Sequence, residues 1–224
     1  DVVGFCELKG SGFHKPPPED IKAWLEKDPS RPPIFLGFGS CVIPGPEKVA
    51  DTIYHAAKKA DVRVMIQQGW AGLGMNLFGR EGVAFVKGTK IDKEGTEAPE
   101  LDVGNTTCDD FCLVIGRVAH TWLFDHVTGV CHHGGAGTTY AGLKAAKPTL
   151  IAPFFGDQPF WGQMVQNAGA GPKPTPIDHW TVDNLASMFT QMCAKDMKKA
   201  AKKLSGAMQK ENGAKKSVEV FYQK

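Results

Sequence analysis

The sequence predicts an α/β protein with a Rossmann-like, doubly wound parallel sheet followed by C-terminal helices. Short apolar runs recur along the chain without polar alternation, which is typical of parallel strands buried on both faces. Segments with helical spacing separate these runs, so successive parallel strands are joined by helices. Apolar residues make up 42% of the 224 residues and charged residues 22%, a composition that allows one large domain with an ordinary core.

Residues 1–32 are predicted to form a linker or entry segment. Lys15–Asp20 contains three consecutive prolines, which stiffen the chain, and Ile21, Trp24 and Leu25 then follow with the spacing of one helical face. The sequence begins without Met and without a signal peptide, so we expect a fragment of a longer protein.

Strands and helices are predicted to alternate from residue 34 onward. Apolar runs predict strands at 34–38, 63–67, 112–118, 129–132 and 148–152, and a short one at 83–86 inside a glycine-rich, charged loop at 69–110. Helical spacing predicts helices at 49–60, 135–146 and 158–168, a short helix at 120–127, and three amphipathic helices near 181–194, 196–210 and 211–223.

The cysteines are typical of a reducing compartment. Six of them are spread along the chain without a Cys-x-x-Cys pair, so we expect free thiols and a cytoplasmic location. Cys131, His132 and His133 are adjacent, but neighbours on one strand point to opposite faces and do not easily share one metal. We therefore expect no metal site. The longest apolar runs, such as 149–155, are far too short to cross a bilayer.

Charge is distributed unevenly along the chain. Residues 195–224 contain nine lysines and three acidic residues, a net charge of +6, whereas the whole chain carries only +2, which leaves −4 for residues 1–194. This pattern argues against a nucleic-acid-binding protein. The lysines at 195, 198, 199, 202 and 203 have the spacing of an exposed stripe on an amphipathic helix. An anionic membrane surface, contacted peripherally, is the alternative interpretation of this stripe.

A glycine-rich turn, "VCHHGGAGTT" at 130–139, follows one predicted strand and opens a helix. Glycines let a ligand approach the backbone closely, and the free N–H groups of a helix N-terminus attract phosphate. The alternative is a tight turn whose glycines serve only packing. A dinucleotide fingerprint is excluded because the Gly-x-Gly of Gly135 and Gly137 is followed by Tyr140 where a third glycine is needed.

An acid and an amide, Asp157 and Gln158, lie side by side in "PFFGDQPFWGQ" after the next strand. A carboxylate and a carboxamide together accept from and donate to vicinal hydroxyls, which suits a polyol. The alternative for Asp157 is an N-cap on the following helix.

Residues 118–165, "VAHTWLFDHVTGVCHHGGAGTTYAGLKAAKPTLIAPFFGDQPFWGQMV", resemble the donor-binding signature of family 1 glycosyltransferases, which are UDP-sugar enzymes of the two-domain GT-B fold. The similarity is greatest to sterol 3-beta-glucosyltransferases, which "GFGS" at 37–40 and "GWAGLG" at 69–74 also fit. The resemblance implies that 1–224 is the C-terminal, donor-binding half, with 181–224 as its C-terminal helices and an N-terminal acceptor domain outside this chain.

The resemblance also implies a donor site for UDP-glucose. The matching positions are Ser40, Val118, His120, His132, Gly135, Ala136, Gly137, Thr138, Asp157 and Gln158. Backbone groups near Val118 would hold the uracil, and His120 is a polar donor-site position. His132 would contact the pyrophosphate, around which residues 136–138 would wrap their N–H groups. Ser40 would face the phosphates across the cleft, and the pair at 157–158 would bind the glucose hydroxyls.

The implied reaction is inverting and needs neither a metal nor another cofactor. One displacement at the anomeric carbon would transfer glucose to the 3-hydroxyl of a sterol or another lipid acceptor, with a histidine of the N-terminal domain as base. His14, His55, His126 and His179 do not lie in that base motif, so we expect ordinary surface or core roles for them. Two classes of function remain: the donor-binding half of a glucosyltransferase, and a nucleotide-sugar-binding module that does not catalyse alone.

Overall fold

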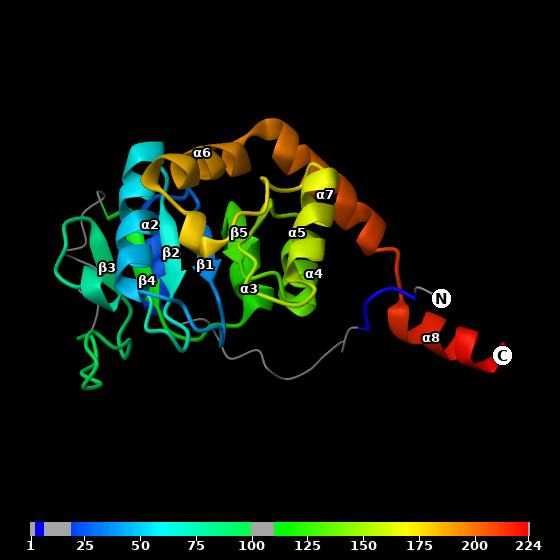
Figure 1. The fold of residues 1–224 in the computed structure, drawn as a ribbon, viewed down its shortest axis with the longest axis horizontal. Helices are drawn as coiled ribbons and strands as arrows, with labels where there is room; N and C mark the ends of the chain where they lie inside the picture. The colour runs from blue at the N-terminus through cyan, green and yellow to red at the C-terminus, as the bar shows by residue number, and fades with distance from the viewer. Residues whose placement is uncertain (1–2, 7–18, 100–109, 224) are drawn as a thin grey trace.

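A six-stranded, fully parallel sheet forms the centre of the protein (Figure 1). The computed structural model describes residues 3–6, 19–99 and 110–223. The strand order is β3-β4-β2-β1-β5-β6. The strands are β1 Ile34–Gly37, β2 Val64–Gln67, β3 Val83–Phe85, β4 Cys112–Ile115, β5 Gly129–His132 and β6 Thr149–Ile151. Every residue of β1, β2, β4, β5 and β6 is buried, as their unbroken apolar runs predict.

Helices cover both faces of the sheet (Figure 1). The α-helices are α1 Glu19–Lys27, α2 Pro46–Ala60, α3 His120–Leu123, α4 Ala136–Lys144, α5 Gln158–Asn167, α6 Val182–Cys193, α7 Lys195–Met208 and α8 Gly213–Tyr222. Short 3-10 helices are η1 Met75–Leu77, η2 Phe124–His126 and η3 Ile177–His179. On one face, α2 and α6 pack against Leu36 and Ile66 in the sheet. On the other face, α1 and α3 pack against Phe35, Met65 and Val130.

The side of the sheet to which new strands are added changes at β1. The strands β2 and β4 are added on one side of β1, and β5 and β6 on the other. The strands β1 and β5 are neighbours, with Gly37 opposite His132 in the register. In open α/β sheets, such a reversal leaves a crevice beyond the carboxyl ends of the two strands, where ligands bind. The predicted glycine turn therefore follows the strand that borders this crevice.

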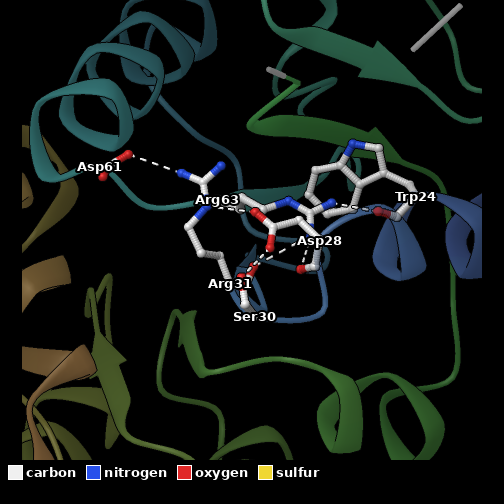
Figure 2. A network of polar contacts seen from close by, with 6 residues as sticks. All are labelled: Trp24, Asp28, Ser30, Arg31, Asp61 and Arg63. Atoms are coloured by element: carbon white, nitrogen blue, oxygen red, sulfur yellow. Dashed lines mark hydrogen bonds and ion pairs between the residues drawn. The ribbon is translucent and has the colours of Figure 1, made fainter. Parts of the chain in front are cut away.

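A polar network ties α1 to the start of β2 (Figure 2). The guanidinium of Arg63 lies 3.6 Å from the centre of the Trp24 ring and donates to the Trp24 carbonyl oxygen over 2.6 Å and to that of Asp28 over 2.9 Å. Arg31 connects the carboxylates of Asp28 and Asp61 at 2.6 and 3.0 Å. Since Arg63 is 3% exposed, these bonds fix the segment that leads into β1.

The first described residues lie against α4 and the start of α8. The Phe5 ring stacks on Tyr140 of α4 with their centroids 4.0 Å apart. A Cβ atom on Gly213, at the start of α8, would lie only 2.5 Å from the Phe5 carbonyl oxygen, and Cys6 Sγ lies 3.8 Å from Ser217 Oγ. Both ends are therefore found on the same side of the protein (Figure 1).

The predicted order of elements is confirmed, with differences at their ends. The strand predicted at 112–118 ends at Ile115, and the helix predicted at 120–127 splits into α3 and η2. The entry segment contains α1, whereas His14, Cys108 and residues 15–18 lie outside the described residues. No helix among residues 19–99 and 110–223 has the length and apolar character needed to cross a bilayer. The division into a linker, a donor domain and terminal helices stays a prediction.

Candidate functional site

The turn after β5 is tight because Gly134 adopts a backbone conformation that other residues rarely adopt. Its φ is +97°, and a Cβ atom there would lie 2.8 Å from Ile151 Cγ2 and 3.1 Å from Gln158 Cβ. Glycine is therefore required both by the dihedral angle and by the close approach of β6 and α5. The turn brings the start of α4 next to the loop that follows β6.

His132 stabilises this turn from inside the protein. Its ring is 0% exposed, and its Nδ1 accepts a hydrogen bond from the Gly134 backbone N–H over 2.9 Å. Its Nε2 is buried and has no hydrogen-bond partner among the described residues. Burial, and then the nearby His133 and His120, lower the pKa of His132 to about 3, so the ring is neutral at pH 7. The structure therefore encloses the ring from which the sequence predicts a pyrophosphate contact, and that contact stays a prediction.

His133 is the histidine that borders the crevice. If Gly135 carried a Cβ atom, that atom would lie 2.6 Å from Nε2 of His133. A Cβ atom on Gly39 would lie 3.8 Å from its Cε1. The ring therefore lies between the loop after β1 and the start of α4. It is partly exposed, its Nδ1 has no partner among the described residues, and burial lowers its pKa. His133 follows the last residue of β5, and its ring centroid lies 6.0 Å from that of His132.

The first turn of α4 has backbone N–H groups for an anion. Its N-cap, Gly135, makes no side-chain capping bond, and Ala136 and Gly137 are exposed. Thr138 is half-buried, while Thr139 is buried and its hydroxyl donates to the Gly135 carbonyl oxygen over 3.0 Å. The first N–H groups of a helix lack intrahelical acceptors and lie at the positive end of its dipole. This arrangement suits a phosphate.

Asp157 and Gln158 follow β6 and have different surroundings. The Gln158 Oε1 accepts from the backbone N–H groups of Phe154 and Phe155 over 2.7 and 3.1 Å, so it shapes the loop. Asp157 is exposed and occupies the N-cap position of α5, as the alternative predicts, but its side chain makes no capping hydrogen bond. Its Oδ2 instead accepts from the Trp161 indole over 2.7 Å. The spacing of four residues on a helix brings Trp161 within reach of Asp157.

His120 lies beside a cavity that also borders the glycine turn. The cavity measures about 480 Å³, and His120 and Gly137 are on its wall. The His120 ring stacks on Phe124 with centroids 4.7 Å apart, and burial, followed by the nearby His133, lowers its pKa. A cavity of this size can enclose a small ligand. The structure therefore brings His120 and the start of α4 together.

Ser40 and Val118 lie on loops at the carboxyl edge of the sheet. Ser40 is exposed in the turn after β1, in which the Cys41 N–H donates to the Phe38 carbonyl oxygen. The neighbouring Gly39 carbonyl oxygen accepts from the Trp70 N–H in the loop after β2. Val118 is half-buried against the core. Residues 19–99 and 110–223 contain no group of three or more His, Cys, Asp or Glu arranged to hold a metal.

Comparisons with known proteins agree with this geometry. Residues 105–220 match the family described as erythromycin biosynthesis protein CIII-like, C-terminal domain. Two sterol 3-beta-glucosyltransferases of Arabidopsis thaliana are 39% and 37% identical to the chain, covering 99% of it and 30% and 31% of their own lengths. A UDP-sugar-dependent glycosyltransferase 52 of Dictyostelium discoideum is 31% identical over 99% of the chain and 13% of its own length. The chain therefore spans less than a third of these relatives.

Solved structures show the same fold at low sequence identity. Arabidopsis thaliana UGT89C1 superposes with a TM-score of 0.66 at 19% identity, covering 96% of this chain and 49% of the other. The glycotransferase of kitacinnamycin gives 0.63 at 16% identity, covering 99% of this chain and 48% of the other. The chain belongs to the family of erythromycin biosynthesis protein CIII-like C-terminal domains, and it has the Rossmann-like α/β fold found in one half of GT-B glycosyltransferases.

Proposed function

We propose that this chain is the donor-binding half of a UDP-glucose-dependent glycosyltransferase that acts on the 3-hydroxyl of a sterol. The observation that carries the proposal is the meeting of an uncapped helix N-terminus and His133 at the β1–β5 crevice, with Asp157 on the adjoining loop. The names of the curated relatives support both the sugar donor class and the sterol acceptor.

The diphosphate would lie on the first turn of α4. The N–H groups of Ala136, Gly137 and Thr138 would surround it, and the neutral His133 ring would donate one further hydrogen bond. This role passes from His132 to His133 because His132 is enclosed and already accepts from Gly134. Ser40 would complete the phosphate site from the loop after β1. No metal enters the proposal, because the positive end of the helix dipole and the hydrogen bond from the imidazole would stabilise the diphosphate.

The nucleoside and the sugar would extend in different directions from this diphosphate. The cavity beside His120 and the backbone near Val118 would hold the nucleoside. Asp157, held by Trp161, would accept hydrogen bonds from glucose hydroxyls, and the Gln158 amide nitrogen would donate to them. Since the Gln158 oxygen is already bonded to the loop backbone, only its nitrogen is assigned to the sugar.

The transfer would be a single inverting displacement. The acceptor oxygen forms a bond to the anomeric carbon while the bond to the phosphate oxygen breaks, and UDP leaves with that electron pair. A base outside this chain takes the hydroxyl proton. The positive end of α4 stabilises the departing UDP in both the bound state and the transition state.

Calorimetry with UDP and UDP-glucose in the presence of EDTA tests the proposal. Both ligands should bind, and His133→Ala should weaken both by about 1.5–3 kcal/mol, the range for a hydrogen bond to a charged group. Asp157→Ala should weaken UDP-glucose and leave UDP nearly unchanged. His179→Ala, an exposed side chain in η3, is the matched control and should change neither. Affinity that disappears on chelation, or equal losses of both ligands in the Asp157 variant, would contradict the proposal.

A further inference from the structure

We propose that a cavity at the amino edge of the sheet, opposite the donor site, binds the phosphate headgroup of an anionic phospholipid. The cavity measures about 540 Å³. Pro32, Thr128 and Pro148 on its wall lie within two residues of the starts of β1, β5 and β6. In a parallel sheet the amino ends of all strands share one edge, so this cavity and the β1–β5 crevice lie at opposite edges.

The walls of the cavity are largely apolar. Leu25 of α1, Pro29 and Pro32 of the following loop, Val127 before β5, and Pro148 before β6 all line it. The cavity is much larger than an inorganic phosphate ion, and apolar walls contribute nothing to holding a bare anion. The walls therefore favour an anion that carries an apolar body.

Three lysines provide the positive charge. Lys147, which enters from the loop after α4, is half-buried and donates to the Asp125 carbonyl oxygen over 3.3 Å. Lys198 and Lys202 are exposed and lie one turn apart on α7. None of the three forms an ion pair in the described parts of the chain, although the carboxylates of Glu26 and Asp125 also line the cavity.

The charges of Lys147 and Lys198 affect each other. Burial lowers the pKa of Lys147, the nearby Asp125 opposes that shift, and Lys198 adds to it. Two ammonium groups close enough to interact, with one of them partly withdrawn from water, are stabilised by an anion between them. The phosphate of a lipid headgroup supplies that charge.

The surface around the cavity is suited to a membrane. Lys195, Lys199 and Lys203 extend the positive charge along the exposed side of α7, next to a single acid, Asp196. The opposite side of the helix is fixed to the body, since Ala201 is buried and the Ser205 hydroxyl donates to the Lys144 carbonyl oxygen over 2.7 Å. An array of lysines on a fixed helix attracts an anionic leaflet, whereas a free small anion needs only the cavity.

Co-sedimentation with phosphatidylcholine vesicles, with and without phosphatidic acid, tests the site at low salt. The chain should bind only the vesicles that contain phosphatidic acid. Lys198→Ala with Lys202→Ala should reduce binding by more than the roughly tenfold loss expected for any two lysines at an anionic surface, because both side chains also line the cavity. Lys199→Ala with Lys203→Ala changes the same helix and the same charge outside the cavity, and should have a clearly smaller effect. Thermal melting should be the same for both double variants.

Two outcomes would overturn the proposal. One is an equal loss of vesicle binding in the two double variants, which would show charge attraction without a site. The other is competition by inorganic phosphate that matches competition by dihexanoyl phosphatidic acid, which would assign the cavity to a free anion. UDP binding should be unchanged in all these variants, so the result is independent of the donor site.

Discussion

The indole of Trp161 donates a hydrogen bond to the carboxylate of Asp157 over 2.7 Å, one helical turn away at the start of α5. This bond restricts an exposed carboxylate before any sugar is bound. A side chain that is already ordered loses less conformational entropy when a ligand binds.

Trp161→Phe should therefore weaken UDP-glucose by about 0.5–1.5 kcal/mol, the value of an ordinary hydrogen bond, and leave UDP unchanged. Calorimetry with both ligands measures the difference. Phe160→Leu, at the exposed neighbouring position, is the control and should have little effect. If Trp161→Phe weakened UDP as strongly as UDP-glucose, the indole would not act through the sugar-binding carboxylate.

His132→Leu should destabilise the fold by about 1–3 kcal/mol, because the buried Gly134 N–H would lose its acceptor. His132→Asn keeps a short acceptor at this position and should recover part of that loss. Urea denaturation measures both variants. His133→Leu is the matched control and should cost less, since no hydrogen bond of its ring is found among the described residues. Similar losses for the two leucine variants would contradict the positioning role of His132.

Stability should fall as the pH is lowered from 7 to 5. The pKa of His132 is lowered to about 3 by burial, with His133 and His120 adding to the shift, whereas an unfolded histidine titrates near its ordinary value of 6.5. Between those values the unfolded chain binds a proton that the folded chain does not, so stability is full above pH 6.5 and is lost below it. For His132 alone the loss at pH 5 is about 2 kcal/mol.

The lowered pKa values of His120 and His133 contribute with the same sign. Urea denaturation of His132→Asn across this pH range should show a shallower slope than the unchanged chain. Parallel slopes would show that His132 does not remain neutral in the folded protein.

Ala146→Gly should stabilise the protein by about 1 kcal/mol. Ala146 has a φ of +57°, in the left-handed region, where a side chain costs about 1–2 kcal/mol, and glycine recovers most of this despite its greater freedom in the unfolded chain. The end of α4 is a Schellman motif, in which the N–H groups of Ala146 and Lys147 donate to the carbonyl oxygens of Leu143 and Gly142, both over 3.0 Å. Thermal melting measures the gain.

Ala145→Gly is the matched control one residue earlier. Ala145 has an ordinary φ of −74°, so glycine there brings only its entropic cost, a loss of about 0.5–1 kcal/mol. Two changes of the same sign would contradict the strain assigned to Ala146.

The sheet was predictable because its strands are short apolar runs separated by helices. Such runs can be recognised from neighbouring residues alone, without knowledge of the fold. The loop character of 69–99 and its short strand were also predictable. The path of the loop was not, because the Gln68 side chain holds it by donating to the Lys90 carbonyl oxygen and accepting from the Lys90 N–H. The end of the fourth strand was also misplaced, since the predicted strand was extended to Val118 while the pairing with β2 ends at Ile115 and that with β3 at Val114.

The parts of the candidate site that a sequence motif specifies were predictable. The parts that depend on which side chains are buried in the fold were not. The glycine turn and the Asp157–Gln158 pair were found from residue types alone. The choice between His132 and His133 was not, because both faces of the sheet are covered and strand alternation does not say which side opens to the crevice. The different tasks of Asp157 and Gln158 depend on the Trp161 indole and on the backbone N–H groups of Phe154 and Phe155, which only the folded loop brings near.

The contact between Phe5 and Gly213 has a topological consequence. Because the segment at Phe5 touches the start of α8, a linker that joins the two ends of the chain has to span little more than the length of this helix. Circular permutants, with new ends opened in the exposed turn near Gly79, should therefore retain the sheet and the glycine turn. For the same reason, polypeptides fused to the two ends would emerge on one side of the protein, separated by the length of α8.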